Sequence, residues 1–154
     1  MLFLQFQLGK DRYALDTHQV VEVLPLLGIK QIPQAPAGVA GAFNYRGEPV
    51  PVIDLSQLAL GHPARRRMST RVIIVRHPGD DGTEHLLGLI AEKTTRTLRR
   101  DPADFTDSGV GNGAAPYLGP VATDPDGLIQ WIEVTKLLPA SVREVLFKQP
   151  PEQS

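Results

Sequence analysis

Cysteine is absent from the 154 residues of this chain, and its absence removes several classes of function at once. Without thiols there is no cysteine-ligated metal, no nucleophilic cysteine and no disulfide framework, and a cysteine-free chain suits a reducing cytoplasm. The histidines lack the short spacing of a metal-binding pair, and we expect them on the surface or in turns; they are His18, His62, His77 and His85. We therefore predict no metal, no thiol chemistry and no other cofactor.

Long apolar runs and an excess of one charge are also missing. No stretch approaches the roughly 20 apolar residues that span a bilayer, and residues 1–8 lack the basic start of a secretion signal. The net charge is −1 and the sequence pI is about 6.4, so the chain has no general electrostatic attraction to nucleic acid or anionic lipid. The sequence predicts a soluble cytoplasmic protein with no direct membrane insertion and no nucleic-acid partner.

Glycine and proline, by contrast, are frequent, with 14 of each, and they divide the chain into short segments. Alternating and β-branched residues predict strands at 4–8, 20–24, 50–54, 71–75, 86–91 and 128–134. Helical signals are brief: capped turns at 16–19 and 54–58, a short helix at 34–42, and a C-terminal helix capped by Thr135 and running toward Phe147. Many short strands separated by turns favour an all-β fold of small barrels.

Two features suggest rival functions. Gly109–Gly113 is rich in glycine like a phosphate-binding loop, but it follows no buried strand and no Gly-Lys-Ser/Thr accompanies it. We interpret it as a flexible connector; the alternative is the site of a small-barrel enzyme or ligand-binding protein. Arg65–Arg67, with Arg71 nearby, is the only basic cluster of the sequence. We interpret it as a solvated turn; contact with an acidic patch of a partner is the alternative, and RNA binding is disfavoured because no aromatic residues are interleaved.

The most informative stretch covers residues 44–55 and predicts a turn followed by a strand. Asn44 and Gly47 are turn residues. Pro49 and Pro51 have no N–H to donate, so this strand lies at an edge or has a neighbour on one side only. Core packing explains Arg46 poorly at such a turn, and we interpret it as a presented surface residue.

Motifs that follow one another in order give the chain a family resemblance. The pattern N-x-R-G-x-x-V-P-V-I-D-L occupies residues 44–55, and it is accompanied by F-Q-L-G at 6–9, V-V-E-V at 20–23, I-P-Q-A-P at 32–36, V-A-G at 39–41, L-G-L-I at 87–90 and L-L at 137–138. Together they resemble the CheW-like domain, the adaptor of bacterial chemosensory arrays that couples receptors to a histidine kinase.

This resemblance implies an all-β fold of two intertwined small SH3-like barrels, with short helices and a C-terminal helix. The first barrel is expected at about 16–76, and the second at about 85–134 with the N-terminal strand added. A C-terminal helix at about 135–147 completes a single domain of residues 1–148. Residues 149–154 are expected to form a disordered tail.

The resemblance also implies a non-enzymatic adaptor that is recruited from the cytoplasm to membrane-bound receptor arrays. One surface is expected to bind the signalling tip of a methyl-accepting chemoreceptor, and its residues are Val20, Glu22, Gly41, Asn44, Tyr45, Arg46 and Glu48. The family's matching Glu and Arg can form a surface ion pair, so Glu22 is expected beside Arg46. Tyr45 adjoins Arg46 and is typical of an exposed interface aromatic, although a structural role is the alternative.

A second surface is expected to contact the regulatory domain of a CheA-like kinase. We place it on the second barrel, at Leu87, Leu89 and Ile90 or at their exposed neighbours. Departures from the family pattern include Glu92-Lys93 in place of a frequent Asp, Tyr45 in place of an aliphatic residue, and a polar segment at 116–127. We interpret them as signs of an alternative pathway, such as a Wsp-type surface-sensing system, rather than flagellar chemotaxis.

Overall fold

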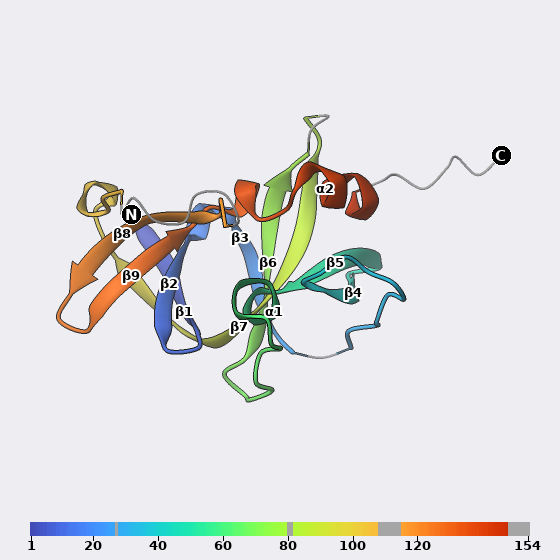
Figure 1. Cartoon of the computed structure of the whole chain (residues 1–154), viewed down its shortest axis with the longest axis horizontal. Coiled ribbons are helices and arrows are strands. Elements are labelled where there is room, and N and C mark those ends of the chain that lie inside the picture. The colour runs from blue at the N-terminus through green and yellow to red at the C-terminus, as the bar shows by residue number, and fades with distance from the viewer. Residues whose placement is uncertain (27, 80–81, 108–114, 148–154) are drawn as a thin grey trace.

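The structure, a computed structural model, describes residues 1–26, 28–79, 82–107 and 115–147 (Figure 1). Within these residues nine strands account for most of the regular structure, which confirms the predicted all-β class. The strands are β1 (Leu2–Leu8), β2 (Asp11–Asp16), β3 (Val20–Pro25), β4 (Val39–Tyr45), β5 (Glu48–Asp54), β6 (Arg71–Pro78), β7 (Glu84–Arg99), β8 (Leu118–Asp124) and β9 (Gly127–Ile132). The helical elements are short: η1 (Thr17–Gln19), α1 (Leu55–Leu60), η2 (Pro102–Asp104), η3 (Val134–Lys136) and α2 (Ala140–Leu146).

One long strand, β7, belongs to two sheets. Its first half, Glu84–Ala91, pairs with β6, and its second half pairs with β1 from Glu92 to Arg99. The first sheet has the order β4-β5-β7-β6-β3, with β5 parallel to β7, and the second has the order β7-β1-β2-β9-β8, with β2 parallel to β9. Figure 1 shows β7 passing from the first group of strands on the right to the second group on the left.

Each sheet closes on itself through one isolated bridge. Lys30 pairs with Ala42 between the chain after β3 and β4, and Thr106 pairs with Val121 of β8. We call the two closed sheets the first and second barrel. The second barrel was expected to contain residues 85–134 and the N-terminal strand; β1 does pair with the second half of β7, but the first half of β7 lies in the first barrel.

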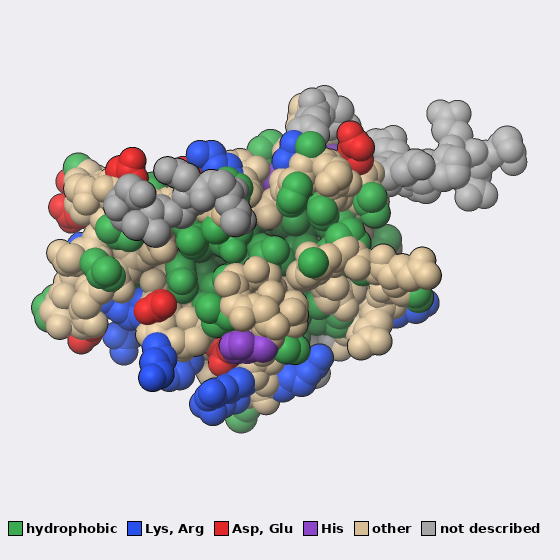
Figure 2. Space-filling model, viewed as in Figure 1, with side chains coloured by type: hydrophobic (Ala, Val, Ile, Leu, Met, Phe, Trp, Pro, Cys, Tyr) green, Lys and Arg blue, Asp and Glu red, His purple; other side chains and the backbone are tan. Residues whose placement is uncertain are grey.

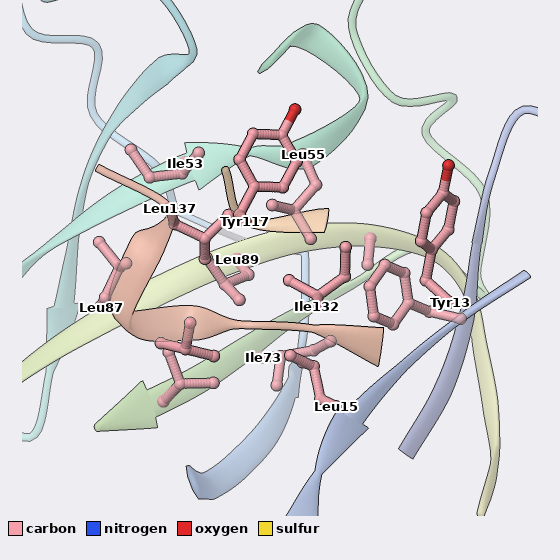
Figure 3. Close-up of a cluster of buried hydrophobic side chains, with 14 of the residues drawn as sticks. Tyr13, Leu15, Ile53, Leu55, Ile73, Leu87, Leu89, Tyr117, Ile132 and Leu137 are labelled. Carbon is pink, nitrogen blue, oxygen red and sulfur yellow. The ribbon is translucent and has the colours of Figure 1, made fainter. Parts of the chain in front are cut away.

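The largest hydrophobic cluster lies between the two barrels (Figure 3). Leu15 and Ile132 come from strands of the second barrel, Ile73 comes from the first, and Leu89 lies on the first half of the shared strand; all four are fully buried. Burial of one such side chain contributes roughly 1.5–3 kcal/mol. A second cluster fills the first barrel, around Ile74, and a third fills the second barrel, where the rings of Phe3, Phe105 and Trp131 meet. The barrels therefore share a core.

Local signals place two of the short helical elements, α1 and η1, as predicted. The Asp54 carboxylate accepts a hydrogen bond from the Gln57 N–H and caps α1, and Gly61 ends this helix in the left-handed conformation, with φ 80°. The Asp16 carboxylate accepts in the same way from the His18 N–H at the start of η1. The edge prediction for β5 is also confirmed, because its proline-containing half pairs with β4 alone and only Val52–Asp54 pair with β7.

Other sequence predictions are wrong. Residues 34–42 form a turn and then β4 rather than a helix, because Gly38 and Gly41 have φ values of 87° and 154° and the strand pairs with β5. The polar segment at 116–127, for which the sequence predicted no element, contains β8. The C-terminal helix begins at Ala140 rather than at Thr135.

Two further predictions concern the histidines and the segments at 109–113 and 149–154. His77 is buried on β6, with 2% of its surface exposed, and its ring lies 5.3 Å from that of Phe147, so its placement on the surface is wrong. Gly109–Gly113 and the predicted tail at 149–154 lie outside the described residues. In the described part of the chain, no helix is long and apolar enough to cross a membrane.

Candidate interaction surface

The hairpin of β4 and β5 turns at Arg46 and Gly47. Tyr45 pairs with Glu48, which leaves these two residues as the loop, and their φ values are 52° and 88°. Positive φ at both central positions is what a type I′ turn requires, and this turn matches the twist of the flanking strands. The Asn44 side chain, which lies on β4 rather than in the turn, accepts a hydrogen bond of 2.9 Å from the Gly47 N–H. The turn therefore presents Arg46, whose side chain is 75% exposed.

Glu22 of β3 lies beside this turn, as the resemblance implies. Its Oε1 accepts a hydrogen bond of 3.1 Å from Arg46 Nη2 and one of 2.7 Å from the Tyr45 hydroxyl. The Arg46 guanidinium carbon lies 5.3 Å from the centre of the Tyr45 ring. These contacts join β3 to β4 on the side where the first barrel has only an isolated bridge, and we call Glu22, Tyr45 and Arg46 the hairpin triad.

The charged contacts of the hairpin triad orient the Arg46 side chain and add little to the stability of the fold. The pKa of Tyr45 is raised, chiefly by the hydrogen bond that its hydroxyl donates to Glu22 and then by desolvation. The ion pair of Glu22 with Arg46 is solvent-exposed, and such pairs contribute only about 0–1 kcal/mol to stability. Its main effect is to hold the arginine in one direction.

Tyr45 is not the exposed aromatic that the sequence suggested. Only 9% of it is exposed, and it belongs to the hydrophobic cluster of the first barrel, with Val50 and Val52. The structural alternative therefore holds for its ring, while its hydroxyl reaches Glu22 at the surface. No local sequence pattern predicts the hydrogen bond between Tyr45 and Glu22, because the two residues are 23 positions apart in the chain.

The remaining residues of the predicted receptor surface divide into two groups. Asn44 and Glu48 are exposed, like Arg46. Val20 is half-buried against the core between the barrels, and Gly41 is buried with its backbone against Lys30. A Cβ on Gly41 would lie 2.0 Å from the Lys30 carbonyl oxygen. Val20 and Gly41 therefore shape the surface rather than present side chains on it.

The predicted kinase contacts need a correction. Leu87 and Leu89 are fully buried between the barrels, and Ile90 is 3% exposed in the cluster of the first barrel. One face of this half of β7 points into the cluster between the barrels, and the other face points into the cluster of the first barrel. The three side chains are not available to a partner in this fold, whereas Glu84 at the start of β7 is exposed.

An apolar groove of about 330 Å³ lies beside β4 and β5. It is lined by the segment Ile32–Pro36, by Pro49 and Pro51 of β5, and by Val145 and Leu146 of α2. Ile32 and Val145 are 39% and 62% exposed. Figure 2 shows hydrophobic side chains gathered in the middle of this face, around α2. The sequence offered no signal for this groove, because its walls come from three distant segments.

Comparison with known proteins identifies the family. A family model described as the CheW-like domain matches residues 2–142. The chain belongs to the CheW-like domain family. Across the described ranges, no group of three or more His, Asp or Glu side chains is placed to hold a metal ion.

Members of the CheW-like family resemble the chain over different lengths. It is 29% identical over 104 residues to the chemotaxis protein CheW of Helicobacter pylori, covering 67% of this chain and 59% of that protein. It is 31% identical over 140 residues to the protein FrzA of Myxococcus xanthus, covering 88% of this chain and 84% of that protein. The chain thus spans about three-fifths of the length of the first relative and most of the second.

A solved structure confirms the fold. The scaffolding protein TtCheW from Thermoanaerobacter tengcongensis superposes with a TM-score of 0.78 at 24% identity, covering 92% of this chain and 89% of that one. The two-barrel architecture implied by the resemblance is therefore that of a CheW-like domain, with SH3-like barrels.

Proposed function

We propose that this protein is a non-catalytic adaptor that couples the signalling tips of methyl-accepting chemoreceptors to a CheA-like histidine kinase in cytoplasmic receptor arrays. One observation carries the proposal: the hairpin triad holds Arg46 exposed, in a backbone conformation that costs free energy. Non-glycine residues with positive φ persist where the surroundings impose them, and they gather at functional sites. The stability gained from an exposed ion pair is too small to explain this arrangement.

The receptor surface consists of the exposed polar residues around the hairpin, namely Glu22, Asn44, Arg46 and Glu48, shaped by Val20, Gly41 and Tyr45. A receptor tip is a helical coiled coil, and a helix that docks on a protein presents an apolar stripe flanked by polar residues. The hairpin supplies charged partners, and the neighbouring groove at Ile32–Pro36 and Val145 supplies apolar ones. This combination supports the receptor as the partner of this surface.

The kinase surface is proposed at the exposed start of β7 rather than at the buried leucines. Glu84 is exposed there, and His85 and Leu86 are half-buried beside Pro49 and Leu146. The contact is proposed with the regulatory domain of the kinase. Assignment to a Wsp-type surface-sensing pathway stays a prediction, and membership of an adaptor family does not favour the rival enzyme or ligand-binding function.

The proposal is tested by reconstituting the adaptor with a receptor signalling fragment and a CheA-like kinase. Arg46→Glu and Glu22→Arg should each abolish most of the receptor-dependent kinase stimulation, because each places like charges side by side. Thermal unfolding should change little, since both side chains are partly solvated. Arg99→Glu, an exposed site on the distant end of β7, serves as the matched control.

The double swap Glu22→Arg with Arg46→Glu separates two roles of the pair. Neighbouring residues are non-additive in such a cycle, whereas independent ones are nearly additive. Any small loss of stability in the single variants should be partly rescued, but receptor binding should be rescued incompletely, because the receptor also reads the charge at position 46. Native-like coupling by the Arg46→Glu single variant would contradict the proposal.

A further inference from the structure

The loop between α1 and β6, residues 61–70, is held in a defined shape at both ends. At its start, both carboxylate oxygens of the buried Asp54 accept hydrogen bonds from the Ala64 N–H, at 3.0 and 3.3 Å. At its end, the hydroxyl of the buried Thr70 donates to the Arg65 carbonyl. These bonds fix the backbone on both sides of the arginine run, so the loop is preorganised.

The tip of this loop presents three arginines and one methionine. Arg65, Arg66 and Arg67 are exposed, and Met68 is 96% exposed, the most of any large hydrophobic residue that the structure describes. No carboxylate of the described residues forms an ion pair with any of the three arginines. By contrast, Arg12 and Arg100 of the second barrel both contact Asp124.

More cations lie next to the loop. The Ser69 carbonyl accepts a hydrogen bond of 2.9 Å from the Thr94 N–H, which brings the loop against the second half of β7. There Ser69 and the exposed side chains of Lys10, Lys93 and Arg96 line an open hollow of about 700 Å³. In Figure 1 the loop and the β1–β2 turn both lie on the lower side of the molecule, and Figure 2 shows Lys and Arg side chains along that edge.

This surface is strongly positive although the chain is not. We call Lys10, Arg65, Arg66, Arg67, Met68, Lys93 and Arg96 the basic face. It carries six cations, and the carboxylates on its rim are Asp11 and Asp126. Because the whole chain has a net charge of −1, the negative charge is concentrated elsewhere. Clustered like charges repel one another, so a local excess of cations is relieved by an anionic partner.

We propose that the basic face docks an acidic protein segment that carries a large apolar side chain. Arginine and methionine are enriched at protein interfaces, and a preorganised loop loses little conformational entropy on binding. Lys10, Lys93 and Arg96 line a hollow that an extended chain segment can enter, and Ser69 joins this hollow to the loop that carries the three arginines and Met68. The face contains no aromatic side chain on which a nucleic-acid base would stack. The proposal adopts the alternative to a solvated turn that the sequence left open, contact with an acidic partner, and it places this site apart from the receptor hairpin.

The experiment measures binding of two glutamate-rich peptides, identical except for a central Leu or Ser, at about 150 mM salt, where exposed charges farther apart than roughly 8 Å are screened. The Leu peptide should bind several-fold tighter than the Ser peptide. The triple variant Arg65→Gln, Arg66→Gln and Arg67→Gln should weaken the Leu peptide by about tenfold, as expected when interface arginines are lost. Met68→Ser should remove the preference for Leu and leave the affinity for the Ser peptide unchanged.

A matched control removes three charges outside the basic face, through Lys30→Gln, Arg99→Gln and Lys136→Gln, and should leave peptide binding nearly unchanged. Three outcomes would overturn the proposal. Equal binding of the Leu and Ser peptides, or equal loss in the triple variant and the control, would mean only general electrostatic attraction. Tighter binding of polyuridylate RNA or of phosphatidylglycerol vesicles than of the Leu peptide would mean another class of partner. No binding of either peptide would mean that the face is solvated.

Discussion

Arg46 adopts a backbone conformation, with φ 52°, that residues other than Gly, Asn and Asp seldom occupy. Its partner in the turn, Gly47, has φ 88° and pays no steric cost there. Asn-Gly is a preferred pair for a type I′ turn, whereas Arg-Gly is not. The side chain of Arg46 therefore explains why arginine occupies this position, since the backbone preference of arginine disfavours the turn.

We predict that Arg46→Asn is more stable than Arg46→Ala by roughly 1 kcal/mol, because Asn tolerates the left-handed region. Both variants lose the contacts with Glu22, so the comparison isolates the backbone. Urea unfolding measures the difference, and both variants should bind the receptor fragment more weakly than the native protein. Equal stability of the two variants would show that the turn relaxes when the arginine is removed.

Gly41 does not tolerate a larger residue for a different reason, because it packs closely against the backbone of Lys30. We predict that Gly41→Ala destabilises the protein severely, by about 3 kcal/mol or more, because the new Cβ would lie 2.0 Å from the Lys30 carbonyl oxygen and would break the Lys30–Ala42 bridge. The melting temperature and the affinity for the receptor fragment should both fall.

Gly28→Ala is the matched control for this prediction. Gly28 also has positive φ, 66°, but a Cβ there meets nothing within 4 Å. It should therefore cost only about 1 kcal/mol of strain. A Gly41→Ala protein that melts like the Gly28→Ala protein would show that the bridge gives way without penalty.

At the scale of secondary-structure elements, side-chain pairs attach strands that the hydrogen-bond ladders leave loosely connected. Arg12 of β2 donates to both oxygens of Asp124 at the end of β8, at 2.9 and 2.5 Å. The pKa of Asp124 is lowered from 3.8, chiefly by the hydrogen bond from Arg12 and despite some desolvation. This bidentate ion pair connects the β8–β9 hairpin to the strand pair of β1 and β2.

We predict that the stability contributed by Asp124 depends on pH. Because its folded-state pKa is depressed, the contribution is fully present above the unfolded value of about 3.9 and is lost as the pH falls through the lower, folded pKa. The free energy of unfolding of the native protein should exceed that of Asp124→Asn by a constant amount above pH 4. The difference should shrink at lower pH. A difference that stays constant down to about pH 2 would contradict the assignment of this carboxylate.

At the scale of the whole molecule, the two barrels share a strand and a core, so neither is complete alone. β7 supplies its first half to the first barrel and its second half to the second. The cluster around Leu89 and Ile132 lies between them. This construction predicts one cooperative unfolding transition.

A substitution in one barrel should therefore lower the unfolding midpoint of both barrels by the same amount. Ile74 lies in the cluster of the first barrel, and Trp131, the only tryptophan, lies in that of the second. Ile74→Ala should cost about 2–5 kcal/mol, and it should lower the urea midpoint by the same amount in Trp131 fluorescence and in far-UV circular dichroism. A fluorescence midpoint that does not move with the circular dichroism midpoint would mean that the barrels unfold separately.

The amino-acid sequence by itself determined what depends on neighbours a few positions away. Asp54 and Gly61 mark the two ends of α1, the prolines of β5 mark a half-strand paired on one side, and alternation marks β1. These signals are read correctly because capping, donor loss and the two-residue period of a strand act locally. The family motif likewise placed Glu22 beside Arg46.

Only the tertiary structure decided which faces are covered and which distant residues meet. It buried Leu87, Leu89 and Ile90 by packing a hydrophobic cluster on each face of β7, and it made Tyr45 a core residue that reaches Glu22. It turned the glycine-containing segment before Tyr45 into a strand, because pairing with β5 outweighs the local helical pattern. Burial and strand pairing are set by contacts between residues far apart in the chain, and for that reason no local pattern contains them.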